Sequence, residues 1–157
     1  CSDNDLRTNI LESARKNAPN LSINLDHLAV LHLSQGNLSA ARDAHSRCVG
    51  LSANSSWRYS YDITGSMIAL AGGDYRQSLR LSNASLVKKP RFVGALRYAM
   101  IGFAMTNSAD NARLMKRSIL KLRPDYDLDA WVEGLLKRSD PVFANNVSIT
   151  LQRHSLI

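Results

Sequence analysis

Histidine is the first residue type in this chain to consider for metal binding or catalysis. The chain has four histidines, at positions 27, 32, 45 and 154. A zinc-protease pair needs two histidines four residues apart and a glutamate beside one of them. His27 and His32 are five residues apart with no glutamate between them. His32 and His45 could approach one another between two helices, but we expect both to pack within the fold and to bind no metal.

Three other patterns resemble reactive or binding motifs without completing one. Asp125, Asp127 and Asp129 alternate as in a calcium loop, but the glycine and the distant glutamate of that loop are missing. We interpret them as acids that stabilise the start of a helix. The Gly72-Gly73 pair lacks the Lys-Ser or Lys-Thr of a phosphate-binding loop, and no serine or cysteine has a nucleophile motif around it. The sequence therefore predicts no catalytic, metal-binding or cofactor-binding residue, and no enzyme.

The cysteines and the ends of the chain bear on cellular context. Cys1 and Cys48 are too few for a disulfide framework, so we expect free thiols in a reducing cytosol. With no signal peptide and no apolar run of membrane-spanning length, a cytoplasmic location is favoured. Because the chain begins with Cys1, we expect a fragment of a larger protein. Five asparagines stand two residues before a serine, and we interpret them as helix caps instead of glycan acceptors: Asn20, Asn37, Asn54, Asn83 and Asn146.

Any binding residues must be positioned by helices, because composition and spacing both favour an all-α fold. Hydrophobic residues make up 45% of the 157-residue chain and aromatic residues only 6%, which suits helices better than a β-sandwich. The turn at Gly73 recurs 34 residues later at Asn107, and Pro90 recurs after the same interval as Pro124. An earlier turn occurs at Gly36. A period near 34 residues with two helices per unit is typical of helix-hairpin repeats.

Small residues at matching places support this interpretation, because two helices cross closely only where the side chains are small. The pairs are Ala29 with Ala41 in the first repeat, Ser66 with Ser78 in the second, and Met100 with Ala112 in the third, where Met100 breaks the rule. We predict a half-repeat at 1–19 with a stripe of Leu6, Ile10, Leu11 and Ala14. Repeats are predicted at about 20–53, 57–90 and 91–124, and capping helices at 125–157. The last helix is expected to start at Asp140-Pro141 and to bury Val142, Phe143, Val147 and Leu151.

Residues 20–124 resemble tetratricopeptide repeats, through "GNLSAA", "GGDYRQSL" and the two spaced prolines. The segments "PRFVGALRYAM", "ADNARLMKRSILKLRPDYDLDAWV" and "SDPVFANNVSITLQRHSLI" look like the C-terminal repeat domain of bacterial multidomain regulators. In those proteins the domain follows a class III nucleotide cyclase or a winged-helix DNA-binding domain. The resemblance implies an α-α superhelix with a C-terminal cap. It also implies a regulatory role in a cytoplasmic bacterial transcription or signalling protein.

The concave side of such a stack is lined by the first helix of each repeat. Repeat phase predicts a mostly apolar peptide-binding groove with one cation and one phenol. Its predicted residues are Ile63, Met67, Leu70, Arg97, Tyr98, Ile101 and Met105. We expect an amphipathic helix or an extended peptide to bind there, with Arg97 orienting an acidic group. Alternatively, another part of the chain or the C-terminal helix fills the groove.

Basic residues are concentrated in the second half of the chain, where only Asp110 opposes those between Arg76 and Arg123. The net charge is +7. We expect a convex basic face composed of Arg76, Arg80, Arg113, Arg117 and Lys121. This face is either simply solvated or a docking site for an acidic partner or for DNA phosphates.

The sequence therefore predicts a non-catalytic domain that binds a protein or a peptide, without a cofactor and without a membrane. Three alternatives remain open. The first is an accessory domain that contacts nucleic acid through the basic face. The second is an oligomerisation module, and the third is a small-molecule sensor that uses the groove.

Overall fold

The structure is a computed structural model that describes residues 9, 10, 13 and 21–157. The half-repeat predicted at 1–19 lies outside the described residues except for Asn9, Ile10 and Ser13. Residues 21–157 form eight α-helices and no strand, so the all-α prediction is confirmed. The helices are α2 (Ser22–Ser34), α3 (Leu38–Leu51), α4 (Arg58–Ala71), α5 (Tyr75–Lys88), α6 (Val93–Met105), α7 (Ala109–Leu122), α8 (Leu128–Leu136) and α9 (Pro141–Arg153).

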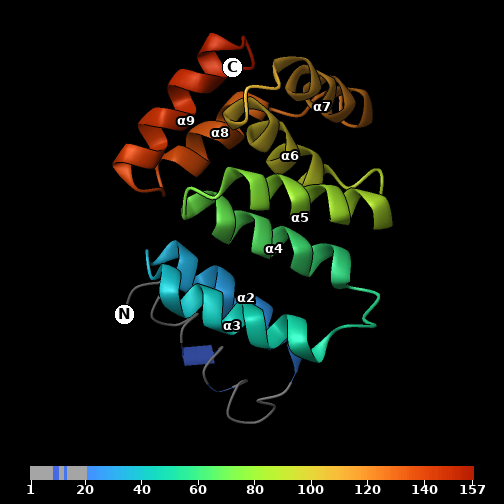
Figure 1. Cartoon of the computed structure of the whole chain (residues 1–157), viewed down its shortest axis with the longest axis vertical. Helices are drawn as coiled ribbons and strands as arrows, with labels where there is room; N and C mark the ends of the chain where they lie inside the picture. Colours follow the sequence, from blue (N-terminus) through green and yellow to red (C-terminus); the bar gives the residue numbers. More distant parts are fainter. Residues whose placement is uncertain (1–8, 11–12, 14–20) are drawn as a thin grey trace.

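Helices α2 to α7 form three consecutive hairpins that stack along the long axis of the molecule (Figure 1). Within the stack, α2 packs against α4 and α4 against α6, so the first helices of the three hairpins share one layer. The second helices α3 and α5 pack between successive members of that layer. This arrangement is the superhelical stack expected from the period. The ranges 20–53, 57–90 and 91–124 each contain one hairpin.

The turn inside each hairpin has the same backbone geometry. Gly36, Gly73 and Asn107 adopt left-handed conformations, with φ of 76°, 78° and 59°. In the second turn the N–H of Gly73 donates to Leu70 O, and that of Asp74 donates to Ala69 O. This is a Schellman ending, which favours glycine or asparagine at the left-handed position. The 34-residue match between Gly73 and Asn107 therefore has a physical cause.

In the first two turns, the side chain of the residue after the left-handed position caps the next helix. The carboxylate of Asp74 accepts a hydrogen bond from the backbone N–H of Gln77, and the side chain of Asn37 does the same for Ala40. Only three residues therefore separate the two helices of each of these three hairpins. The downstream ends follow the prolines, since α5 stops two residues before Pro90 and α7 two residues before Pro124.

The capping interpretation of the Asn-X-Ser asparagines is right at only one described position. Asn37 caps α3, but Asn83 and Asn146 lie inside α5 and α9 and are exposed. Asn54 lies in the link before α4, whose N-cap residue is Trp57. Aspartates cap α5, α8 and α9 instead, because a carboxylate both accepts the free N–H groups and favours the positive helix end. Asn20 lies outside the described residues.

The fourth hairpin, α8 and α9, does not simply extend the stack. Helix α9 packs against α6 and α8, and the pair lies beside α6 at one end of the stack (Figure 1). Asp140 caps α9 by accepting from the N–H groups of Val142 and Phe143, as predicted from the Asp-Pro pair. Phe143, Val147 and Leu151 are buried as expected. The prediction for Val142 was wrong, since 70% of it is exposed. It lies one residue away from a stripe with a spacing of four and therefore faces solvent.

One hydrophobic cluster runs from α4 to the C-terminus. Ile101 of α6, Ile119 of α7, Val147 and Leu151 of α9 and Leu156 are fully buried within it. The last residues are held in place by a further left-handed turn, in which Ser155 has φ of 55° and the N–H of Leu156 donates to Leu151 O. The fourth hairpin therefore shares its core with the third.

Candidate functional site

An apolar hollow lies between the inner helix layer and the fourth hairpin. It has a cavity volume of about 430 Å³, within the range of small-molecule and peptide-anchor pockets. Its wall from the stack consists of Val30, Leu33, Ser34, Gly36, Leu38, Met67, Leu70, Ala71 and Tyr98. Its wall from the fourth hairpin consists of Trp131, Leu135, Arg138, Ser139, Asp140 and Phe143. We call this hollow the inner cavity.

An aromatic corner fixes the position of α8 over α6 at the edge of the inner cavity. The rings of Tyr98 and Trp131 meet edge to face, with centroids 5.6 Å apart and an interplanar angle of 85°. The Arg97 guanidinium lies over the Trp131 ring, 4.6 Å from its centroid, and donates a hydrogen bond to the hydroxyl of Tyr126. Such ring pairs and cation–π contacts each stabilise by about 0.5–1.5 kcal/mol. They hold the wall of the cavity in one arrangement.

The polar groups of the inner cavity cluster where α8 passes into α9. Asp140 is engaged as the N-cap of α9. Arg138 is exposed, and its side chain has no hydrogen bond or ion pair within residues 21–157. Burial raises the pKa of the Tyr98 hydroxyl, while Arg97 and Arg138 act in the opposite direction, so the phenol stays protonated at neutral pH. The cavity therefore combines an apolar interior with one unpaired cation at its rim.

The residues predicted to line the groove divide into three groups. Met67, Leu70 and Tyr98 line the inner cavity. Ile63 and Ile101 are core residues, and Met105 packs against the same core. Arg97 does not line the cavity, because its guanidinium donates to the Tyr126 hydroxyl and lies over the Trp131 ring. At the third hairpin, α9 packs against α6. Over this end of the groove, the arrangement agrees with the alternative in which the C-terminal helix fills the groove.

Sequence reasoning missed the whole second wall of the inner cavity. Trp131, Leu135, Arg138 and Phe143 come from a hairpin that was expected only to cap the end of the stack. The available signal was the concentration of large apolar side chains in "DAWVEGLL", which exceeds what one buried stripe of a short helix needs. On the other wall, Val30 and Leu33 of α2 also line the cavity.

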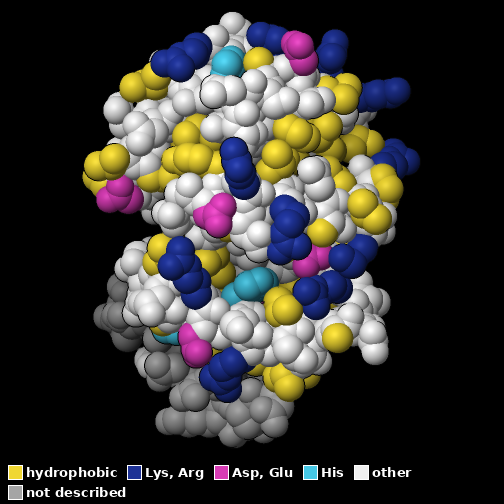
Figure 2. Space-filling model, in the orientation of Figure 1, with side chains coloured by type: hydrophobic (Ala, Val, Ile, Leu, Met, Phe, Trp, Pro, Cys, Tyr) yellow, Lys and Arg dark blue, Asp and Glu magenta, His cyan; other side chains and the backbone are white. Residues whose placement is uncertain are grey.

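The predicted basic face is distributed over the second helices. All five of its residues are exposed: Arg76, Arg80, Arg113, Arg117 and Lys121. Figure 2 shows Lys and Arg side chains spread over one face of the molecule with few acids among them. Among the described residues, only two of the five side chains have a polar contact: Arg113 forms an ion pair with Asp110 at 2.7 Å, and Arg80 donates to Gln77. The remaining cations are free to bind solvent or a partner.

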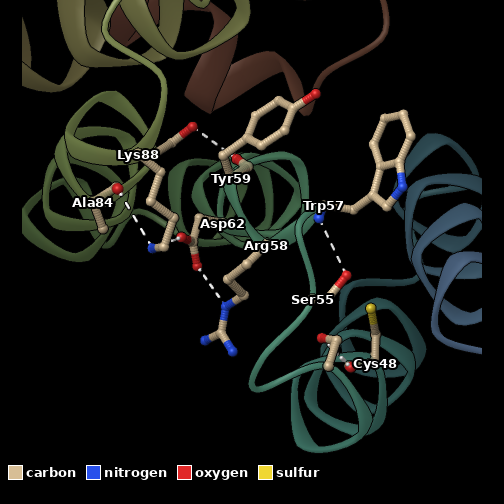
Figure 3. A network of polar contacts seen from close by, with 10 residues as sticks. Cys48, Ser55, Trp57, Arg58, Tyr59, Asp62, Ala84 and Lys88 are labelled. Atoms are coloured by element: carbon tan, nitrogen blue, oxygen red, sulfur yellow. Dashed lines mark hydrogen bonds and ion pairs between the residues drawn. The ribbon is translucent and has the colours of Figure 1, made fainter.

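The buried carboxylate of Asp62 links the start of α4 to the end of α5. Asp62 is 4% exposed at its side chain and accepts from Arg58 Nε at 3.0 Å and from Lys88 Nζ at 2.8 Å (Figure 3). Lys89, the next residue, donates to the hydroxyl of Tyr59 and lies over its ring. The flanking Ser85 donates to the backbone oxygen of Tyr59. These contacts tie the end of α5 to the start of α4 and are structural in character.

Two buried titratable groups lie near the first two hairpins. Burial raises the pKa of Asp26, against a hydrogen bond from Thr64 and the charge of His27, and its Oδ1 atom has no partner in the described part of the chain. Burial raises the pKa of the free Cys48 thiol to about 11, and nearby Asp26 adds to the rise. A thiol with such a pKa is protonated at neutral pH and is a poor nucleophile.

Groups of three or more His, Cys, Asp or Glu side chains that could hold a metal ion do not occur among the described residues. No helix among those residues is both long and apolar enough to cross a membrane. The expectations of no metal, no cofactor and no catalysis stay predictions. No family model and no curated protein matches this chain.

Proposed function

We propose that this chain is a tetratricopeptide-like repeat domain that binds a short apolar segment of a partner protein in the inner cavity. The single observation that supports this function is the hollow itself. Three hairpins and the returning fourth hairpin leave about 430 Å³ open among apolar side chains, next to an arginine without a partner. Apolar burial supplies the affinity, and Arg138 takes the orienting role that the sequence assigned to Arg97.

The binding segment is expected to be short. The far end of the inner surface is covered by α9, so a long helix cannot lie along the whole groove. One or two apolar side chains fit the hollow, with an acidic group beside them for Arg138. In a larger cytoplasmic bacterial regulator, such binding would couple a partner to the transcription or signalling output. The parent protein, its location and its output remain part of this proposal.

The experiment is a selection of twelve-residue peptides from a displayed random library on the folded chain. Peptides that bind the inner cavity should lose about 30-fold in affinity on Met67→Glu, the equivalent of a 2 kcal/mol hot-spot loss. The matched control is Val87→Glu, which adds the same charge at a side chain that is 83% exposed on α5. If the selected peptides bind wild type, Met67→Glu and Val87→Glu alike, the inner cavity is not the peptide site.

A second candidate function, contact with nucleic acid, is favoured by the exposed and mostly unopposed cations of the basic face. Binding through phosphates should weaken steeply as salt rises, whereas apolar binding in the inner cavity should barely respond. Replacing Arg113, Arg117 and Lys121 by Gln should abolish only the salt-sensitive mode. If neither a single-stranded nor a double-stranded oligonucleotide binds at low salt, this second function is excluded.

A further inference from the structure

A second hollow lies on the opposite, outer side of the molecule, between the second helices α3 and α5. Its cavity volume is about 470 Å³, and helix α4 forms its floor. Its polar lining includes Arg42, His45, Ser46, Arg58, Asp62, Asp74, Gln77 and Arg80. We call this hollow the outer cleft. Figure 2 shows a histidine with Lys and Arg side chains around it where the first two hairpins meet.

The floor of the outer cleft depends on Gly65. A Cβ atom at this position would lie 2.5 Å from His45 Nε2 and 3.0 Å from a methyl carbon of Leu81. The missing side chain therefore lets the His45 ring lie directly on α4. The other ring nitrogen, Nδ1, is buried and has no hydrogen-bond partner within residues 21–157. A buried polar atom without a partner is uncommon and is a natural contact for a ligand.

Three arginines, one from each wall and one from the floor helix, line the same cleft as this histidine. Arg58 uses Nε for Asp62, and its terminal nitrogens point away from that contact (Figure 3). Arg80 uses Nε for Gln77. The Arg42 side chain has no hydrogen bond or ion pair in the described part of the chain, and its Nη2 lies 2.4 Å from the position that a Cβ on Gly72 would take. Each guanidinium thus retains free donors.

The two carboxylates of the outer cleft offset these charges only in part, because three arginines face two aspartates. Asp62 is already shared by Arg58 and Lys88, and Asp74 caps α5 through its contact with the Gln77 N–H. The cleft is therefore left with a surplus of positive charge and with several unused N–H donors in one place. This arrangement suits a compact anion with several acceptor oxygens.

We propose that the outer cleft binds a phosphate monoester, carried by a phosphorylated side chain of a partner protein. A monoester has close to two negative charges and three terminal oxygens at one point, which matches three guanidinium groups around one hollow. The phosphodiesters of a nucleic acid have one charge each and two free oxygens, and binding them requires a strip of cations along several phosphates. The convergence on His45 and Gly65 favours the monoester. This site is separate from the inner cavity, so neither proposal depends on the other.

The test uses the folded chain labelled with ¹⁵N and three probes: two peptides at equal molar concentration, and an oligonucleotide matched to the phosphopeptide in phosphate concentration. The first is an acetylated pentapeptide, Gly-Ala-phosphoserine-Ala-Gly, the second is the same peptide with serine, and the third is an oligothymidylate of ten nucleotides. We expect the phosphopeptide to cause saturable shifts in the His45 ring and in the side-chain N–H signals of Arg42 and Arg80. The serine peptide should cause none.

Matched variants separate the cleft from general electrostatics. Arg42→Gln combined with Arg80→Gln should weaken phosphopeptide binding at least 10-fold. Arg113→Gln combined with Arg117→Gln removes the same charge outside the cleft and should change it less than twofold. All four side chains are exposed, and far-UV circular dichroism verifies the fold. If the double variant were poorly folded, Arg80→Gln alone should still weaken binding about threefold.

Three results would overturn the proposal. The first is equal weakening by the two double variants, which would mean that binding follows net charge. The second is binding of the serine peptide as tightly as the phosphopeptide. The third is tighter binding of the oligothymidylate than of the phosphopeptide, which would assign the outer cleft to nucleic acid.

Discussion

The hydroxyl oxygens of Ser66 and Ser78 lie 2.8 Å apart at the point where α4 crosses α5. Both residues are fully buried. Ser66 also contacts the Ser82 hydroxyl at 2.8 Å, and Ser82 donates to the Ser78 carbonyl. The crossing therefore depends on small side chains. Where the first hairpin has the two buried alanines Ala29 and Ala41, the second has serines whose hydroxyls contact one another.

Enlarging this crossing should be costly. Ser78→Met forces α4 and α5 apart and is expected to lower the free energy of unfolding by about 2–3 kcal/mol. The matched control is Asn83→Met, which adds the same side chain at an exposed position of α5 and should change stability by less than about 0.5 kcal/mol. Urea unfolding followed by circular dichroism measures both. Equal stability of the two variants would contradict the close-crossing account.

The position of α8 should depend on Arg97. Arg97→Leu removes the stacking on Trp131 and the hydrogen bond to Tyr126, with an expected loss of about 1–2 kcal/mol. Amide hydrogen exchange should speed up in residues 128–136 and stay unchanged in α2 and α3. Exchange that rises equally in all helices would mean that Arg97 supports the whole fold and not the position of α8.

Asp26 should destabilise the protein at neutral pH. Its folded pKa is raised by burial, so the native state keeps its proton more readily than the unfolded chain does. The stability contributed by the protonated form is present below the unfolded pKa, near 3.8, and is lost as pH rises through the folded value. Asp26→Asn should therefore be more stable than wild type at pH 7 and nearly equal to it at pH 3. Thermal unfolding at the two pH values measures the difference, and a wild type that is more stable at pH 7 would contradict the assignment.

Cys48 should behave as an inert thiol. With a folded pKa of about 11 against an ordinary value of 9.0, the native state holds the proton that the unfolded chain releases. Its contribution to stability is present below pH 9 and declines between about pH 9 and 11. Cys48→Ala should reduce this alkaline loss, which pH-dependent unfolding of the two proteins measures.

The same burial should block modification of Cys48. In a Cys1→Ser background, a thiol reagent should react at pH 8 only after urea is added. Rapid reaction of the native protein would show that Cys48 is accessible.

Local signals explain why the hairpins could be predicted from sequence. A left-handed Gly36 or Gly73 and the proline after a helix determine chain direction within a few residues. The small pair Ser66 and Ser78 marks a crossing without any knowledge of the rest of the fold. Met100 broke that rule in sequence yet is fully buried, because a flexible thioether fills an irregular space.

The binding site was less predictable because its second wall is built by long-range packing. Repeat phase placed Met67 and Tyr98 on the inner surface, and both line the inner cavity. The return of Trp131 onto Tyr98 depends on contacts between residues 33 positions apart, which no local pattern encodes. We expected Arg97 to face a ligand, but its guanidinium instead contacts Tyr126 and Trp131.

Fluorescence of Trp131 tests the central claim, that the inner cavity is the binding site, most directly. Trp57 is the only other tryptophan in the chain and is 56% exposed, so Trp57→Phe leaves Trp131 in the cavity wall as the sole reporter. Titration with a selected peptide should shift the Trp131 emission saturably, with the same affinity as direct binding, and Met67→Glu should abolish both signals. A peptide that binds with full affinity while the Trp131 emission stays constant would contradict the account.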